Sequence, residues 1–278
     1  MRPGGIVDGR FVLGRVLGRG RMGTVYEARD QATSGWVAVK VLENERDAAT
    51  ARFAREAAAQ ESLLHENIVR HVTHGTTAGG VPYLVMERID GEDLGARLER
   101  GPLAVADALG VARGVAAGLA AAHARGIIHR DVKPANVLLP GGDVHAPKLT
   151  DFGVARVLGA ATTLTRTGHI VGTPAYMAPE QAEGGAEVDA PVDVFALGSV
   201  LYHCLAGRPP FEGADVRVVL AKILFAEAPP LHSVRDDVPA AVEALVVEMM
   251  AKNPTRRPPS GADVRARLDR IAATTPLT

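Results

Sequence analysis

Apolar and polar positions alternate with a short period in the first third of the chain. Residues 11–41 contain β-rich runs separated by glycines, a pattern typical of antiparallel strands joined by turns. Residues 68–72 and 83–87 predict two further strands around the Gly79-Gly80 turn, and residues 52–64 predict a helix. This part of the chain is therefore expected to form an antiparallel sheet with one helix.

The pattern becomes helical after Glu87. Residues 102–125 follow a helical period, and their alanines favour a packed helix over a linker. Short strand-like pieces broken by Pro and Gly occupy residues 127–148, and residues 191–206 and 239–251 predict apolar helices. These elements predict an α+β fold in which a small β-rich lobe precedes a larger helical lobe.

The boundary between the two lobes is expected near residues 86–91. Residues 1–88 would form the N-lobe and residues 89–278 the C-lobe, together one domain. A chain of 278 residues is long enough to bury a substantial core.

Composition excludes some partners. The net charge of −1 provides no global field to attract nucleic acid or an anionic membrane, so no nucleic-acid partner is predicted. Residues 1–9 lack an apolar signal core, and no stretch reaches the roughly 18 apolar residues of a membrane span, so a cytoplasmic location is expected. The single cysteine, Cys204, lies in an apolar run and is predicted to be a buried structural thiol.

A glycine motif occurs early in the strand-rich part. Residues 18–23, with Gly18, Gly20 and Gly23, match GxGxxG, which both dinucleotide-binding folds and kinases use to bring backbone N–H groups to phosphate. A dinucleotide loop should open a helix, whereas residues 24–28 continue as a strand. The motif therefore predicts a glycine loop between two strands.

Lys40 follows this loop among apolar neighbours. A lysine on a strand is more often solvated, but the spacing from the glycine loop indicates a phosphate-holding role. A lysine in apolar surroundings needs a counter-charge, and Glu56, on the predicted helix, is the candidate.

The most specific motif is residues 129–136, which read HRDVKPAN. It places a carboxylate, a lysine and a carboxamide at fixed offsets in one loop, as Asp131, Lys133 and Asn136. Asp151-Phe152-Gly153 and Ala178-Pro179-Glu180 follow in order. Chance is a poor explanation for motifs that agree in both content and order.

These motifs resemble those of the protein kinase family over about residues 11–268. The form Val132-Lys133-Pro134 and the segment 172–182 are similar to bacterial serine/threonine kinases of the eukaryotic type. The resemblance implies a two-lobed kinase fold, transfer of the ATP γ-phosphoryl group to Ser/Thr hydroxyls of protein substrates, and a role in signalling.

The resemblance also implies residue roles. Asp131 would orient the substrate hydroxyl, Lys133 would lie near the moving phosphoryl charge, and Lys40 with Glu56 would grip the phosphates. Asn136 and Asp151 would hold Mg²⁺, with Mn²⁺ as an alternative. The expected ATP contacts are Leu17, Gly18, Gly20, Gly23, Val25, Ala38, Lys40, Met86, Glu87, Ile89, Asp93, Asn136, Leu138 and Asp151. Among these, Met86 would be the gatekeeper, Glu87 and Ile89 the hinge, and Asp93 the ribose contact. For Val25, Ala38 and Leu138, which would enclose the purine, simple core packing is the alternative.

Regulation is expected between Asp151 and Glu180. The loop carries Thr162, Thr163, Thr165 and Thr167, and phosphate on such a threonine would pair with Arg130. Thr165 and Thr167 align best with autophosphorylated threonines, which predicts self-association for phosphorylation in trans; the alternative is that they are ordinary polar loop residues. By resemblance, Asp193 would anchor the catalytic loop, and Glu180 and Arg257 would form a buried ion pair.

One departure from the family pattern concerns Gln60 and His71. They occupy positions where active kinases stack apolar side chains on Phe152 and His129. One hypothesis is that they hydrogen-bond each other and loosen the active arrangement; the other is a shifted alignment in which Leu63 and Val72 fill the stack.

Two other functions are alternatives to the kinase function, and each should lack part of this pattern of residues. A pseudokinase should lack at least one of Lys40, Asp131, Asn136 or Asp151, and all are present. A small-molecule phosphotransferase should lack the segment 173–180, which is intact.

Ala135 predicts no strong preference for basic substrates. Related kinases often continue into a membrane span, so the chain is alternatively the intracellular part of a receptor kinase.

Overall fold

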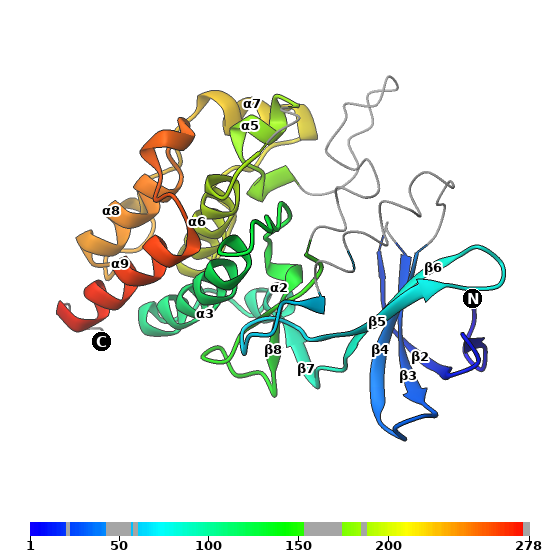
Figure 1. Ribbon diagram of the computed structural model, residues 1–278. Coiled ribbons are helices and arrows are strands. Elements are labelled where there is room, and N and C mark those ends of the chain that lie inside the picture. Colours follow the sequence, from blue (N-terminus) through cyan, green and yellow to red (C-terminus); the bar gives the residue numbers. More distant parts are fainter. Residues whose placement is uncertain (21–22, 43–56, 58–60, 153–173, 185–187, 275–278) are drawn as a thin grey trace.

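The computed structural model of the chain describes residues 1–20, 23–42, 57, 61–152, 174–184 and 188–274. The strands of the first part gather on one side of the molecule and the helices on the other (Figure 1). The expected α+β, two-lobed architecture is confirmed.

The N-lobe is built on a six-stranded antiparallel sheet with the order β1-β2-β3-β4-β6-β5. Its strands are β1 Ile6–Val7, β2 Phe11–Gly20, β3 Gly23–Asp30, β4 Trp36–Leu42, β5 His71–Thr76 and β6 Pro82–Glu87. Val37, Val39 and Val41 of β4 pack into a cluster on one face of the sheet, whereas Ala38 and Leu42 join a second cluster on the other. Lys40 therefore lies on the second face, since side chains alternate along a strand.

The predicted strand at residues 68–72 is wrong in its bounds, because β5 begins only at His71. Ile68 instead forms a parallel bridge with Leu149, whose N–H donates to the Asn67 carbonyl at 2.9 Å. Ile68 packs in the large cluster of the C-lobe. Its apolar character thus reflects contact with the other lobe and not a place in the N-lobe sheet.

The C-lobe consists of helices and a small three-stranded sheet, β7-β8-β9. The strands are β7 Gly91–Asp93, β8 Val137–Pro140 and β9 Lys148–Leu149. The helices are α2 Leu94–Leu98, α3 Val105–His123, α5 Pro179–Ala182, α6 Pro191–Ala206, α7 Val216–Phe225, α8 Ala240–Met249 and α9 Gly261–Thr274, with short 3₁₀ turns at Pro134–Asn136, Pro174–Tyr176, Leu231–Ser233 and Pro254–Arg256. The predicted helices at 191–206 and 239–251 correspond to α6 and α8.

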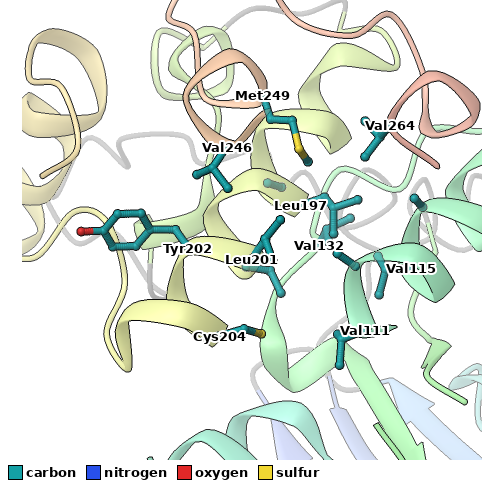
Figure 2. Packing of buried hydrophobic residues seen from close by; sticks show 14 of the residues in the cluster. Val111, Val115, Val132, Leu197, Leu201, Tyr202, Cys204, Val246, Met249 and Val264 are labelled. Carbon is teal, nitrogen blue, oxygen red and sulfur yellow. The ribbon is translucent and has the colours of Figure 1, made fainter. Parts of the chain in front are cut away.

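Helix α6 is the centre of the C-lobe core. Figure 2 shows Leu197 and Leu201 of α6 between Val115 of α3 and Val246 of α8. Cys204 is fully buried in the same cluster, and burial raises its thiol pKa to about 12. The predicted structural role of this cysteine is confirmed.

Among the described residues, α3 is the one helix long and apolar enough, by length and composition, to cross a membrane. The absence of a membrane segment therefore stays an expectation. Most of α3 is buried against α6 and α9, as in the core helix of a folded domain.

Candidate active site

The catalytic loop connects α3 to β8 and carries three polar side chains in mutual contact. The Lys133 ammonium donates to Oδ2 of Asp131 at 2.7 Å, and the Asn136 amide donates to the same oxygen at 3.0 Å. Asn136 also donates to the Asp131 backbone carbonyl at 2.7 Å. The motif thus folds into a cluster around one half-buried carboxylate, as its spacing predicted.

Asp193 of α6 fixes the backbone of this loop by hydrogen bonds. Its buried carboxylate accepts hydrogen bonds from the backbone N–H groups of His129, at 2.8 Å, and Arg130, at 2.7 Å. His123 completes the set, with Nε2 at 2.9 Å. These bonds hold Arg130 at φ 69°, a conformation that side-chain-bearing residues rarely adopt. The expected anchoring role of Asp193 is confirmed.

Lys40 meets Asp151 where the two lobes face each other. The Lys40 ammonium donates to Oδ1 of Asp151 at 2.8 Å, and the Lys40 side chain is only 6% exposed. Burial alone would raise the pKa of Asp151, but the charge and hydrogen bond of Lys40 outweigh it and the pKa is lowered. The expected partner of Lys40, Glu56, lies outside the described residues, as does Gln60.

Phe152, next to Asp151, packs on the catalytic loop. Its ring centroid lies 4.5 Å from that of His129, whose Nε2 is 2.9 Å from the Thr150 carbonyl oxygen. Leu63 and Phe152 share the large C-lobe cluster, whereas Val72 packs on the opposite side of the N-lobe sheet. Of the two residues in the shifted-alignment hypothesis, only Leu63 reaches Phe152's cluster.

The residues expected around the purine come together between the lobes. Ala38 pairs with Met86 across β4 and β6, and Val25, Ile89 and Leu138 pack against the same apolar cluster. Met86 is nearly buried and accepts a contact from the Thr150 hydroxyl at 3.7 Å. The grouping is as predicted, while contact with adenine stays a prediction.

Glu87 and Asp93 make contacts that sequence did not predict. The Glu87 carboxylate accepts from the Arg70 backbone N–H, at 2.9 Å, and from the Lys148 ammonium, at 2.8 Å. Asp93 caps helix α2 by accepting from the Ala96 N–H at 3.0 Å. Both side chains therefore stabilise the segment that joins the two lobes; a hinge role for Glu87 and a ribose contact by Asp93 stay predictions.

The glycine loop joins two paired strands. Gly18 lies opposite Val25 and Gly20 opposite Gly23, so the three glycines belong to paired strands and Gly23 begins a strand and not a helix, which excludes the dinucleotide-binding alternative. Gly23 has φ 146°, and a Cβ there would lie 2.0 Å from the Val41 carbonyl oxygen. Leu17, before the loop, is 40% exposed.

A pocket beside the catalytic loop opens toward α5 and α6. Arg130, Asp131, Lys133, Tyr176 and Gln181 are among its lining residues. The Gln181 amide donates to the Arg130 carbonyl at 2.9 Å and so ties helix α5 to the loop. Thr162, Thr163, Thr165 and Thr167 lie outside the described residues.

The expected ion pair of the C-lobe is also present. Nη1 and Nη2 of Arg257 donate to the Glu180 carboxylate, at 2.6 and 2.8 Å. The Arg257 side chain is fully buried and also donates to the carbonyls of Ala251, Pro191 and Lys252. This pair joins the end of the segment that contains the expected phosphorylation sites to the C-lobe core.

The sheet over a helical lobe, with Asp131, Asn136 and Asp151 between them, defines a protein kinase catalytic domain. Residues 11–265 match the family described as protein kinase domain, and the chain belongs to that family. It is 44% identical over 275 residues to the serine/threonine-protein kinase PkaA of Streptomyces coelicolor and 41% identical over 271 residues to PknB of Mycobacterium tuberculosis.

The alignments cover 93% and 94% of this chain but only 49% of PkaA and 43% of PknB, so the chain spans half or less of these relatives. The crystal structure of the Mycobacterium tuberculosis PknI kinase domain superposes with a TM-score of 0.76 at 29% identity, over 97% of this chain and 98% of that one. Rad53 in complex with AMP-PNP has a TM-score of 0.77 over 93% of this chain and 64% of its own, at 24% identity, a likeness of fold.

Proposed function

We propose that this chain is the catalytic domain of an ATP-dependent serine/threonine protein kinase. The observation that carries the proposal is the contact of Asp131 with Lys133 and Asn136, in a loop whose backbone is held by Asp193. Phosphoryl transfer asks the protein mainly for positioning and charge neutralisation, and this cluster supplies both.

The residues present suit the divalent metal ion that protein kinases use. Because the Asn136 amide nitrogen donates to Asp131, its oxygen is the atom left for a cation. Asp151 has its Oδ1 on Lys40, which leaves Oδ2 for the same purpose. Such hard oxygen ligands favour Mg²⁺, with Mn²⁺ as the alternative. The ion would neutralise phosphate charge when bound.

Each remaining side chain has a role in this proposal. Asp131 orients the hydroxyl of the acceptor and receives its proton, while Lys133 neutralises charge on the transferred phosphoryl group. Lys40 binds the α- and β-phosphates under the glycine loop, and the apolar cluster around Ala38 and Met86 encloses the adenine.

The acceptor is proposed to be a Ser or Thr hydroxyl of a protein that enters by the pocket beside Tyr176 and Gln181. Thr165 or Thr167 of a second copy of the chain is the first such acceptor, with Arg130 as the partner of the new phosphate. We place this activity inside the cell, in a free kinase or in the intracellular part of a receptor kinase.

The test is transfer of phosphate from ATP by phosphatase-treated chain, in Mg²⁺ or Mn²⁺, to itself and to dephosphorylated casein. Asp131→Asn should reduce turnover by about 10²- to 10⁴-fold, because a positioned proton acceptor contributes that much. Asp236→Asn, at an exposed position away from the site, is the matched control. Mass spectrometry should find phosphate at Thr165 or Thr167 in the wild type and the control.

Wild-type chain that binds ATP without any transfer would instead be a pseudokinase. Equal turnover in wild type and Asp131→Asn would reject the assigned role of Asp131.

A further inference from the structure

Two histidines of β5 lie on one face of the N-lobe sheet although their spacing predicts opposite faces. His71 and His74 are three residues apart, and alternation along a regular strand would separate them. A β-bulge between His71 and Thr73 inserts one extra residue, so His71 lies opposite Met86 and His74 opposite Leu84. Both histidines therefore lie on the face that also carries Leu84 and Met86.

Glu61 approaches this pair from a different part of the chain. Its Oε1 is 3.2 Å from Nδ1 of His74 and 3.9 Å from Nδ1 of His71. One ligand atom from each of the three residues lies within 4.8 Å of the others. Two imidazoles and a carboxylate thus converge on a single point.

His71 is poorly satisfied in this environment. Its side chain is only 4% exposed, and neither ring nitrogen has a hydrogen-bond partner among the described residues. Burying such polar atoms without a partner is costly, and a native structure rarely leaves them so. An imidazole ring can offer one nitrogen lone pair to a metal ion.

We propose that Glu61, His71 and His74 bind a Zn²⁺ ion. Zinc accepts imidazole nitrogen and carboxylate oxygen, and two histidines with one glutamate leave a fourth position for water. Bonds of about 2.1 Å in a tetrahedron separate ligand atoms by about 3.4 Å, so the observed spacings need only a movement of about 1 Å. Imidazole ligands favour zinc over the Mg²⁺ that suits Asp151 and Asn136.

The ion would attach Glu61, which has helical backbone, to strand β5. His71 also lines a pocket together with Leu63, Met86, Asp151 and Phe152, so the metal site adjoins the candidate active site. Bound zinc is therefore expected to slow hydrogen exchange in residues 61–76. The zinc proposal does not depend on the proposed kinase activity. If the chain binds no zinc, the kinase proposal is unaffected.

The test uses the tag-free chain, stripped of metal with a chelator and dialysed against Zn²⁺ in excess Mg²⁺, which saturates the oxygen ligands. One zinc per chain is expected, and Co²⁺ in its place should give the absorption bands of a tetrahedral site. Glu61→Gln, His71→Gln and His74→Gln should each weaken binding by more than the roughly 10- to 100-fold typical of losing an outer-shell partner.

His232→Gln is the matched control. His232 also pairs with a glutamate, Glu243, at 2.9 Å, but it is 68% exposed, and among the described residues this pair has no third group that could bind a metal ion. This variant should bind zinc as the wild type does. Melting curves of the metal-free variants show whether they fold; Glu61 is 52% exposed, so Glu61→Gln is expected to fold normally. Absence of retained zinc, or equal affinity in wild type and Glu61→Gln, would overturn the proposal.

Discussion

The ammonium group of Lys40 and the carboxylate of Asp151 form a hydrogen-bonded ion pair of 2.8 Å across the gap between the lobes. The partners come from β4 and from the segment after β9, so the pair links the sheet to the catalytic half. Asp151 has φ 65°, an unfavourable conformation for a non-glycine residue, which the surrounding contacts must hold.

Lys40→Met should therefore affect both nucleotide binding and Asp151. Removing a preorganised positive charge of this kind should reduce turnover by about 10²- to 10³-fold. The pKa of Asp151 should rise, since its burial is then unopposed by Lys40. Steady-state kinetics and a carboxyl titration by NMR measure the two effects. Lys222→Met, at an exposed position of α7, is the control and should leave both unchanged.

The Glu180–Arg257 pair predicts a folding defect. Replacing Glu180 with Leu leaves the buried guanidinium with carbonyl partners alone among the described residues and should cost about 3 to 5 kcal/mol of unfolding free energy. Urea denaturation measures the loss. The double variant with Arg257→Leu should recover part of it, because no charge is then stranded; a simple sum of the two single losses would contradict this account.

Two glycines of the same hairpin should respond differently to alanine. In Gly23→Ala, the new methyl group would collide with the Val41 carbonyl at a strained φ, and a loss of about 1 to 3 kcal/mol or more is expected. In Gly20→Ala no atom of the described residues lies within 4 Å of the added carbon, so stability should change by less than about 0.5 kcal/mol. Equal melting temperatures for the two variants would rule out the steric explanation.

Asp30 predicts a pH dependence of stability. The buried Asp30 carboxylate accepts hydrogen bonds from both Nε and Nη2 of Arg10 at 2.7 Å, and these bonds lower its pKa below the ordinary value of about 3.9. A lowered folded-state pKa stabilises the protein above that ordinary value, and the contribution is lost as the pH falls through the folded pKa.

Wild type should therefore exceed Asp30→Asn in urea midpoint at pH 7, and the difference should shrink below about pH 4. Asp236→Asn, at an exposed position, should track the wild type over the whole range. A gap between wild type and Asp30→Asn that persists unchanged at pH 2 would argue against the carboxylate as its source.

Much of the site could be predicted because its residues are local in sequence. Asp131, Lys133 and Asn136 lie within one short loop, so fixed offsets are enough to indicate a cluster. Asp193 was found only by resemblance, since its hydrogen bonds to the loop join positions more than 60 apart. The Lys40–Asp151 contact spans 111 positions, and no local pattern predicts which carboxylate a lysine will meet.

The errors in the fold have a similar origin. Ile68 and Val69 read as part of a strand because they are β-branched and apolar, but their partner is Leu149 of the other lobe. The bulge that brings His71 and His74 together leaves no mark in composition, because it depends on how β5 pairs with β6.

Residues 67–69 belong to the N-lobe in sequence but are hydrogen-bonded to the C-lobe, and this has a consequence for a chain that a protease has cut between the lobes. Asn67 donates to the Pro147 carbonyl at 2.9 Å, and Val69 donates to the Leu149 carbonyl at 2.8 Å. A protease that cuts between Arg88 and Ile89 severs the hinge but leaves these bonds, and the packing of Leu63 and Ile68 beneath them, in place. The two fragments should therefore co-elute in gel filtration, and should separate only when denaturant is added.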